Sequence, residues 1–158
     1  MKKTLSFSLC FIMLFSSCTK KETTNEIDYT TINSSWECDY FKIGVNSNWN
    51  ITENIDGNYI SVTWDRNGAS PIFCHFSYGE FLKKYTQNEL IQKWKSDEHS
   101  EDASFDTFIK NGQAYIITKD SSQFEGIEFY SDKLWGTFTF YSDYEDYVLK
   151  MIDTIVFY

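Results

Sequence analysis

The chain has only two histidines for acid–base or metal chemistry, and neither stands in a catalytic pattern. His75 follows Cys74 directly, an order that suggests a cysteine–histidine nucleophile. Adjacent residues of a strand point to opposite faces of a sheet, so these two side chains cannot form the hydrogen bond that activates a thiol. The sequence offers little material for a histidine-based zinc site or a Ser-His-Asp triad. We therefore predict no catalytic residue and no enzyme activity.

The second histidine, His99, lies in an acidic stretch that could hold a divalent cation. Its neighbours Asp97, Glu98, Glu101 and Asp102 supply the hard oxygen ligands that such ions prefer. The stretch lacks the glycine turn and the alternating ligand spacing of a calcium loop. A solvated run of charges explains it equally well, and we predict neither a metal nor a cofactor.

Cys38 and Cys74 are a candidate disulfide if the domain lies outside the cytoplasm. In the chain-entropy treatment, a bridge closing that loop stabilises the fold by about 4 kcal/mol. The alternative is a pair of free cysteines that act as small buried apolar residues. A Cα separation above about 7 Å would forbid the bridge.

Aromatic residues form 19% of the chain, with five tryptophans and eleven tyrosines. Such side chains build sugar-stacking platforms and protein-binding faces, but they also fill the cores of β-sheets. We expect Trp94 and Trp135 to lie in a core. Trp36 and Trp49 are expected to be partly exposed, which makes them a candidate binding surface.

The N-terminal residues have the pattern of an export signal. Two lysines precede an apolar run over 5–15, which is too short to cross a bilayer because a spanning helix needs about 20 residues. The following LFSSC resembles the lipobox of bacterial lipoproteins, although Phe15 stands where leucine is usual. The resemblance implies cleavage after Ser17 and a thioether-linked diacylglycerol on Cys18. The alternative is an ordinary secretory signal with an incidental cysteine.

These features predict a bacterial membrane protein held by lipid, with its domain facing the periplasm or the cell exterior. Cleavage removes two lysines and no acid, so the net charge changes from −9 to −11. A chain of that charge repels phosphate backbones, and we predict that it binds no nucleic acid. Residues 18–35 are polar and are expected to form a tether, followed by a single domain over 36–158.

The first part of that domain has the period of antiparallel strands. Apolar residues alternate over 41–45, and similar runs occupy 59–65 and 72–78. Turn residues separate them, namely Asp56-Gly57 and Asn67-Gly68. We expect the three runs to be neighbours in one sheet.

Two amphipathic helices interrupt the strands. Thr86 and Glu89 form a capping box that opens a helix ending near Ser96, and Ser142 and Glu145 form a second. Residues of the second helix recur at the spacing of a buried stripe: Tyr144, Tyr147, Val148, Met151 and Ile152.

The remaining strands complete the architecture. Asn111-Gly112 is a strong hairpin signal between 104–110 and 113–119, and strand-like runs follow at 127–131 and 134–141. The last residues, TIVFY, are expected to pair with the sheet. The pattern predicts an α+β fold in which a mainly antiparallel sheet is covered by two amphipathic helices.

This order of elements resembles the PsbP/DcrB-like superfamily, found in bacterial lipoproteins and in an extrinsic subunit of photosynthetic membranes. The resemblance covers 41–158 and rests on FKIGVNSNW, the capped helix, IKNGQAY, and a last helix that runs into DTIVF. Asn46 stands where the family usually has proline. The resemblance implies a small membrane-attached module that acts through binding or assembly, and it carries over no ligand residues.

Three functional hypotheses follow. The first is a lipid-anchored, non-catalytic module that binds a protein or another envelope partner. The second is an aromatic-lined binder of a glycan or another small ligand, for which a concave site with aromatic walls would be the sign. The third is an uncharacterised hydrolase, for which a buried carboxylate of raised pKa in a pocket would be the sign.

Overall fold

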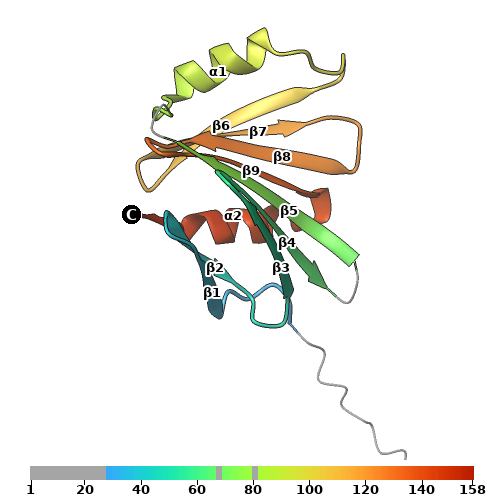
Figure 1. The fold of residues 1–158 in the computed structure, drawn as a ribbon. Coiled ribbons are helices and arrows are strands. Elements are labelled where there is room, and N and C mark those ends of the chain that lie inside the picture. The colour runs from blue at the N-terminus through green and yellow to red at the C-terminus, as the bar shows by residue number, and fades with distance from the viewer. Residues whose placement is uncertain (1–27, 67–68, 80–81) are drawn as a thin grey trace, which may run out of the picture.

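Seven antiparallel strands form the main sheet of the α+β fold, in the order β3-β4-β5-β9-β8-β7-β6 (Figure 1). The computed structural model describes residues 28–66, 69–79 and 82–158, so the predicted signal peptide, Cys18 and the 67–68 turn lie outside the described residues. The strands are β3 (Asn50–Asp56), β4 (Tyr59–Arg66), β5 (Ala69–Tyr78), β6 (Ser104–Lys110), β7 (Gln113–Lys119), β8 (Phe124–Tyr130) and β9 (Leu134–Tyr141).

Two of the predicted strand features are confirmed in this sheet. The runs at 59–65 and 72–78 lie in β4 and β5, which pair with each other. Asn111 and Gly112 both have positive φ, at 49° and 74°, which is the conformation that a two-residue hairpin turn requires.

A second, three-stranded sheet has the order β1-β2-β10 and consists of β1 (Ser34–Glu37), β2 (Phe41–Val45) and β10 (Val156–Phe157). The prediction that β2 is a neighbour of β4 is therefore wrong. Alternating burial identified the strand but did not specify its partner, because both sheets offer an apolar face. The expected pairing of the C-terminal residues is confirmed, since Val156 pairs with Lys42 and Phe157 with Phe41.

The main core lies between the large sheet and a layer made of the small sheet and α2 (Glu145–Asp153) (Figure 1). Four residues of the predicted stripe are confirmed, because Tyr147, Val148, Met151 and Ile152 are all buried in α2, whereas Tyr144 precedes the helix and is half-buried. The second capping box is wrong. Residues Ser142–Tyr144 form a short 3₁₀ turn, which makes Glu145 the first residue of α2, and its carboxylate accepts a hydrogen bond from Lys119 Nζ at 2.6 Å instead.

Helix α1 (Gln87–Ser96) lies on the opposite face of the large sheet, over β6 and β7 (Figure 1). Its predicted capping box and its end at Ser96 are confirmed. Leu90 packs with Ala114 and Ile116 in a second, smaller core. Trp94, which we expected in the core, is half-buried at the margin of this cluster, and its Nε1 donates to Thr118 Oγ1 at 3.1 Å.

The segment before β1 belongs to the domain, so the predicted tether that extended to residue 35 is too long. Tyr29 and Ile32 pack against the main core. The buried Asn46 donates from Nδ2 to the carbonyl oxygens of Asp28, at 2.9 Å, and Thr31, at 2.6 Å. The predicted tether is too long because residues 28–33 are held through their backbone carbonyl oxygens. The polar composition of the segment gives no sign of such contacts. Neither helix among the described residues is long and apolar enough to cross a membrane.

Candidate functional site

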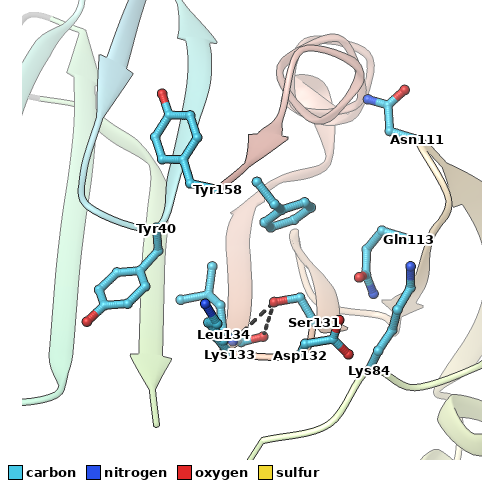
Figure 2. Close-up of a pocket in the computed structure, with 10 residues that line it drawn as sticks. Tyr40, Lys84, Asn111, Gln113, Ser131, Asp132, Lys133, Leu134 and Tyr158 are labelled. Atoms are coloured by element: carbon cyan, nitrogen blue, oxygen red, sulfur yellow. Dashed lines mark hydrogen bonds between the residues drawn. The ribbon is translucent and has the colours of Figure 1, made fainter. Parts of the chain in front are cut away.

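A cavity of about 320 Å³ opens at one end of the domain, where five separate chain segments meet (Figure 2). We call it the end cavity. The turn between β1 and β2, the segment before α1, the β6–β7 hairpin, the turn between β8 and β9, and the residues of β10 all contribute to it. Its lining residues are Tyr40, Lys84, Asn111, Gln113, Ser131, Asp132, Lys133, Leu134, Phe157 and Tyr158.

Two lysines at this cavity, Lys84 and Lys133, have no carboxylate within ion-pair distance among the described residues. Most other described lysines are paired; Lys110, for example, lies 2.7 Å from Asp153 Oδ1. The end cavity therefore holds two uncompensated cations in a chain whose net charge is −9. Asp132 is the acidic side chain in the lining.

Two amide side chains line the same cavity. Gln113 is only 2% exposed, and its Nε2 donates to the carbonyl oxygens of Ala114 and Tyr130, both at 2.9 Å. Asn111 Nδ2 lies 3.3 Å from the carbonyl oxygens of Asp153 and Ile155, where it fastens the hairpin to the end of α2. Since its nitrogen is committed, the Gln113 side-chain oxygen is left as a hydrogen-bond acceptor, whereas the Asn111 oxygen points away from the other lining residues (Figure 2).

Two tyrosines complete the lining with rings that point away from Gln113 and Lys84 (Figure 2), and each is held in place by a neighbour. The Tyr40 ring stacks on Tyr78 with ring centroids 4.3 Å apart. Tyr158 Oη donates to Glu37 Oε1 at 2.8 Å, and its backbone N–H donates to the Tyr40 carbonyl oxygen at 3.0 Å. That hydrogen bond to Glu37 raises the pKa of Tyr158, so its phenol stays neutral at physiological pH. This part of the lining is therefore uncharged and positioned without a ligand.

A second candidate surface is the part of the large sheet that α1 leaves uncovered, which we call the open face. On β4, β5 and β9 the residues that alternate with the core point outward, and they combine hydroxyl and aromatic side chains. Tyr59 Oη and His75 Nδ1 share a hydrogen bond of 2.6 Å on this face. The open face consists of Tyr59, Ser61, Thr63, Phe73, His75, Trp135, Thr137 and Thr139.

The expectation that Trp36 and Trp49 are partly exposed is wrong, because they are 8% and 4% exposed. Trp36 lies on β1 inside the main core and donates from Nε1 to Glu53 Oε2 at 3.0 Å. Trp49 stacks on Tyr147 with centroids 5.1 Å apart, and the docked N-terminal segment covers it. Once residues 28–33 are part of the fold, neither tryptophan is available as a binding surface.

Cys38 and Cys74 are free cysteines in the structure, which is the alternative to the candidate disulfide. Cys74 is completely buried in the main core, and burial raises the pKa of its thiol well above the usual value. His75 lies on the open face, so the inference that these neighbours point apart is confirmed. A protonated thiol without a base is no nucleophile.

The acidic stretch around His99 is engaged in ordinary surface contacts. Asp97 pairs with Lys93 at 2.6 Å, Asp102 accepts from the Ser121 backbone N–H at 2.9 Å, and the His99 ring stacks on Trp94. Within the described ranges, no group of three or more potential ligands is arranged to hold a metal ion.

One carboxylate has the raised pKa that the hydrolase hypothesis requires, but it does not line the end cavity. Glu125 is 10% exposed, and its burial raises the pKa of the carboxyl group. Its Oε2 lies 3.6 Å from Lys119 Nζ, an ion-pair distance that is too long for a hydrogen bond. Lys119 donates its hydrogen bond to Glu145 instead. Glu125, Lys119 and Glu145 therefore form one ion-pair cluster on the sheet.

Sequence reasoning singled out neither the end cavity nor the open face. The cavity residues come from distant segments and share no motif. The open face had one detectable signal, namely the hydroxyl and aromatic residues that alternate with the core in β4 and β9. Compared with models of known protein families and with curated protein sequences, the chain matches none.

Proposed function

We propose that this protein is a lipid-anchored extracytoplasmic module of the PsbP/DcrB-like kind, which binds a protein partner of the cell envelope without catalysis. The observation that carries the binding role is the open face. Helix α1 packs on β6 and β7, and on the same side of the sheet no other described element covers β4, β5 and β9. Cys18, within its lipobox, supplies the membrane attachment in this proposal.

The composition of the open face fits a partner that offers both hydrogen bonds and apolar contacts. Thr63, Thr137 and Thr139 supply hydroxyl groups on adjacent or nearby strands, and Phe73 and Trp135 supply aromatic surface. Aromatic residues are enriched at protein interfaces, where they contribute much of the binding energy. Rigid strands hold these side chains at fixed spacing, which favours recognition of a preformed protein surface.

Anchoring is tested by mass spectrometry of the protein purified from its native membrane. We expect a chain that begins at Cys18 and carries the mass of a diacylglycerol and further acyl groups. A Cys18→Ser variant should lose membrane association. An unmodified thiol at position 18, or an uncleaved leader, contradicts this part of the proposal.

Partner binding is tested by affinity capture from envelope extracts with two matched variants. Thr139→Arg places a bulky cation in the open face, opposite Phe73 and beside Gly126. Gln92→Arg makes a comparable change on the exposed side of α1. We expect one partner to be captured by the wild type and by Gln92→Arg and to be lost with Thr139→Arg. Equal capture by both variants rules out the open face as the interface.

The second candidate, a small-ligand binder, is favoured by one specific observation. The end cavity is concave and has tyrosine side chains in its wall, which is the sign expected for that hypothesis. The two candidates use different surfaces of the domain, so they are tested independently.

A further inference from the structure

We propose that the end cavity binds a small organic acid: its carboxylate contacts Lys84 or Lys133, and its hydroxyl or ammonium donors contact the Gln113 side-chain oxygen and Asp132 (Figure 2). This inference rests on the second candidate function and gives it a ligand class. It requires neither the lipid at Cys18 nor a partner on the open face.

The lysines are the first argument, because they select for a negative ligand. The structure leaves four described lysines without an ion pair: Lys84, Lys95, Lys133 and Lys150. Two of these four line one cavity. An anion that reaches either of these two lysines gains a charge-assisted contact without displacing an existing partner.

The hydrogen-bond acceptors are the second argument, because they require that the ligand also donate. Gln113 commits its nitrogen to backbone carbonyls, so its side-chain oxygen is left as an acceptor at the cavity. Asp132 adds a carboxylate to the lining. Figure 2 shows Gln113 and Lys84 on one side of the cavity and Lys133 on the other, with Asp132 between the two lysines. An anion without hydrogen-bond donors would exclude water from these acceptors and leave them unpaired.

Size and anion type narrow the ligand further. A volume of about 320 Å³ is near the lower limit of ligand pockets, which suits a molecule with one ring or one amino acid. A phosphate group would favour a free helix N-terminus. The nearby N-terminus of α1 already has its Thr86 N–H bonded to Glu89. We therefore infer a carboxylate and keep phosphate as the competing anion in the test.

Two kinds of molecule share this chemistry, namely sugar acids and amino acids. The probes that separate them are glucuronate and phenylalanine, with glucose as the uncharged match and inorganic phosphate as the competing anion. Binding is measured by calorimetry on the purified mature chain, and the contact residues are identified by ¹⁵N NMR shifts. Asp132→Asn provides a further distinction, because it should weaken an ammonium ligand more than a hydroxyl ligand.

The variants are Lys84→Met and Lys133→Met, with Lys95→Met and Lys150→Met as controls. All four remove an exposed lysine that has no ion pair, so none is expected to unfold the domain. We expect one of the two acids to bind, glucose and phosphate to bind at least ~tenfold more weakly, and at least one of the two cavity variants to weaken binding ~tenfold or more. The controls should bind like the wild type.

Three results overturn the inference. They are an absence of NMR shifts at the end cavity with either acid, unchanged affinity in both cavity variants, and phosphate binding as tight as that of the acids. Failure of lipidation or of partner capture leaves these measurements unaffected, so the two proposals fail separately.

Discussion

Asn46 should be one of the most sensitive positions in the domain, and Asn46→Asp tests why. The side chain is completely buried and makes three hydrogen bonds. Its Nδ2 donates to the carbonyl oxygens of Asp28 and Thr31, and its Oδ1 accepts from the Asn48 backbone N–H at 2.8 Å. The substitution keeps the shape and replaces the donor with an oxygen, which would then face two carbonyl oxygens at 2.9 and 2.6 Å.

The magnitude follows from these contacts. Two lost hydrogen bonds remove about 1 to 3 kcal/mol of stability, and leaving buried acceptors unpaired adds about 1 to 3 kcal/mol for each. Detachment of residues 28–33 limits the loss, because the segment can leave the domain once docking becomes unfavourable. We therefore expect Asn46→Asp to lower the free energy of unfolding by about 3 kcal/mol at pH 7.

The pH dependence gives an additional check. The introduced carboxyl group would be buried beside two carbonyl oxygens, so its pKa in the folded state should lie above the value in the unfolded chain. Its destabilising effect should therefore be greatest above the folded pKa and should decrease as the pH falls through it. A protonated carboxyl group regains one donor for one of the two carbonyl oxygens.

The measurement is urea unfolding of the mature protein, combined with hydrogen exchange of residues 28–33. The control is Asn48→Asp, the same isosteric change at an exposed side chain two residues away, which should alter stability by less than about 0.5 kcal/mol. We expect Asn46→Asp alone to shift the urea midpoint by about 1 to 2 M and to raise exchange in the segment. Equal midpoints and equal exchange for the two variants would refute this account of the docking.

Three further predictions concern stability. Gly136→Ala should lower the free energy of unfolding by about 1 to 3 kcal/mol in urea unfolding, because its new Cβ would overlap the Phe129 ring. Gly79→Ala is the control, because a Cβ there has open space and should not destabilise the protein. Glu125→Gln should raise the urea midpoint at pH 7, because burial raises the pKa of the wild-type carboxyl group and makes its charged form unfavourable. The gain in midpoint should shrink as the pH falls and the wild-type carboxyl group takes up its proton. A gain that grows at low pH contradicts this explanation. Thr86→Ala should cost about 1 kcal/mol in thermal or urea unfolding through loss of the α1 cap, and an unchanged midpoint would mean that the cap contributes nothing.

Features encoded in neighbouring residues could be predicted from the sequence. The turn at Asn111-Gly112 depends on two residues that tolerate positive φ, and the α1 cap depends on two side chains three residues apart. The α2 stripe depends on a helical period. In each case the residues that specify the feature also form it, within one short segment. Tertiary contacts therefore have little opportunity to override the local preference.

Features that depend on distant partners could not be predicted. Strand β2 has the correct period, but its partners are β1 and the C-terminal β10. Trp36 is buried because the small sheet packs on the large one, which brings Trp64 within 6.0 Å of its ring. The end cavity is the extreme case, since it exists only where five segments meet.

Asn46 also connects separate parts of the domain. Its backbone N–H donates to Tyr147 Oη at 2.8 Å, a hydrogen bond that proline could not make because it has no N–H. The asparagine side chain supplies, in addition, the two hydrogen bonds that hold the N-terminal segment. Asn46 therefore links α2, β2 and residues 28–33 at one buried point.

This link determines how the proposed anchor and the end cavity are related. If the chain from Cys18 were unattached up to Trp36, it could span about 60 Å, whereas docking at Asp28 limits the span to about 35 Å. Asn46 follows the C-terminal end of β2, and Tyr40 precedes its N-terminal end, so the docked segment and the cavity lie at opposite ends of that strand. In a lipid-anchored protein this arrangement keeps the domain close to the membrane and places the end cavity at the end of β2 that lies away from the attached segment.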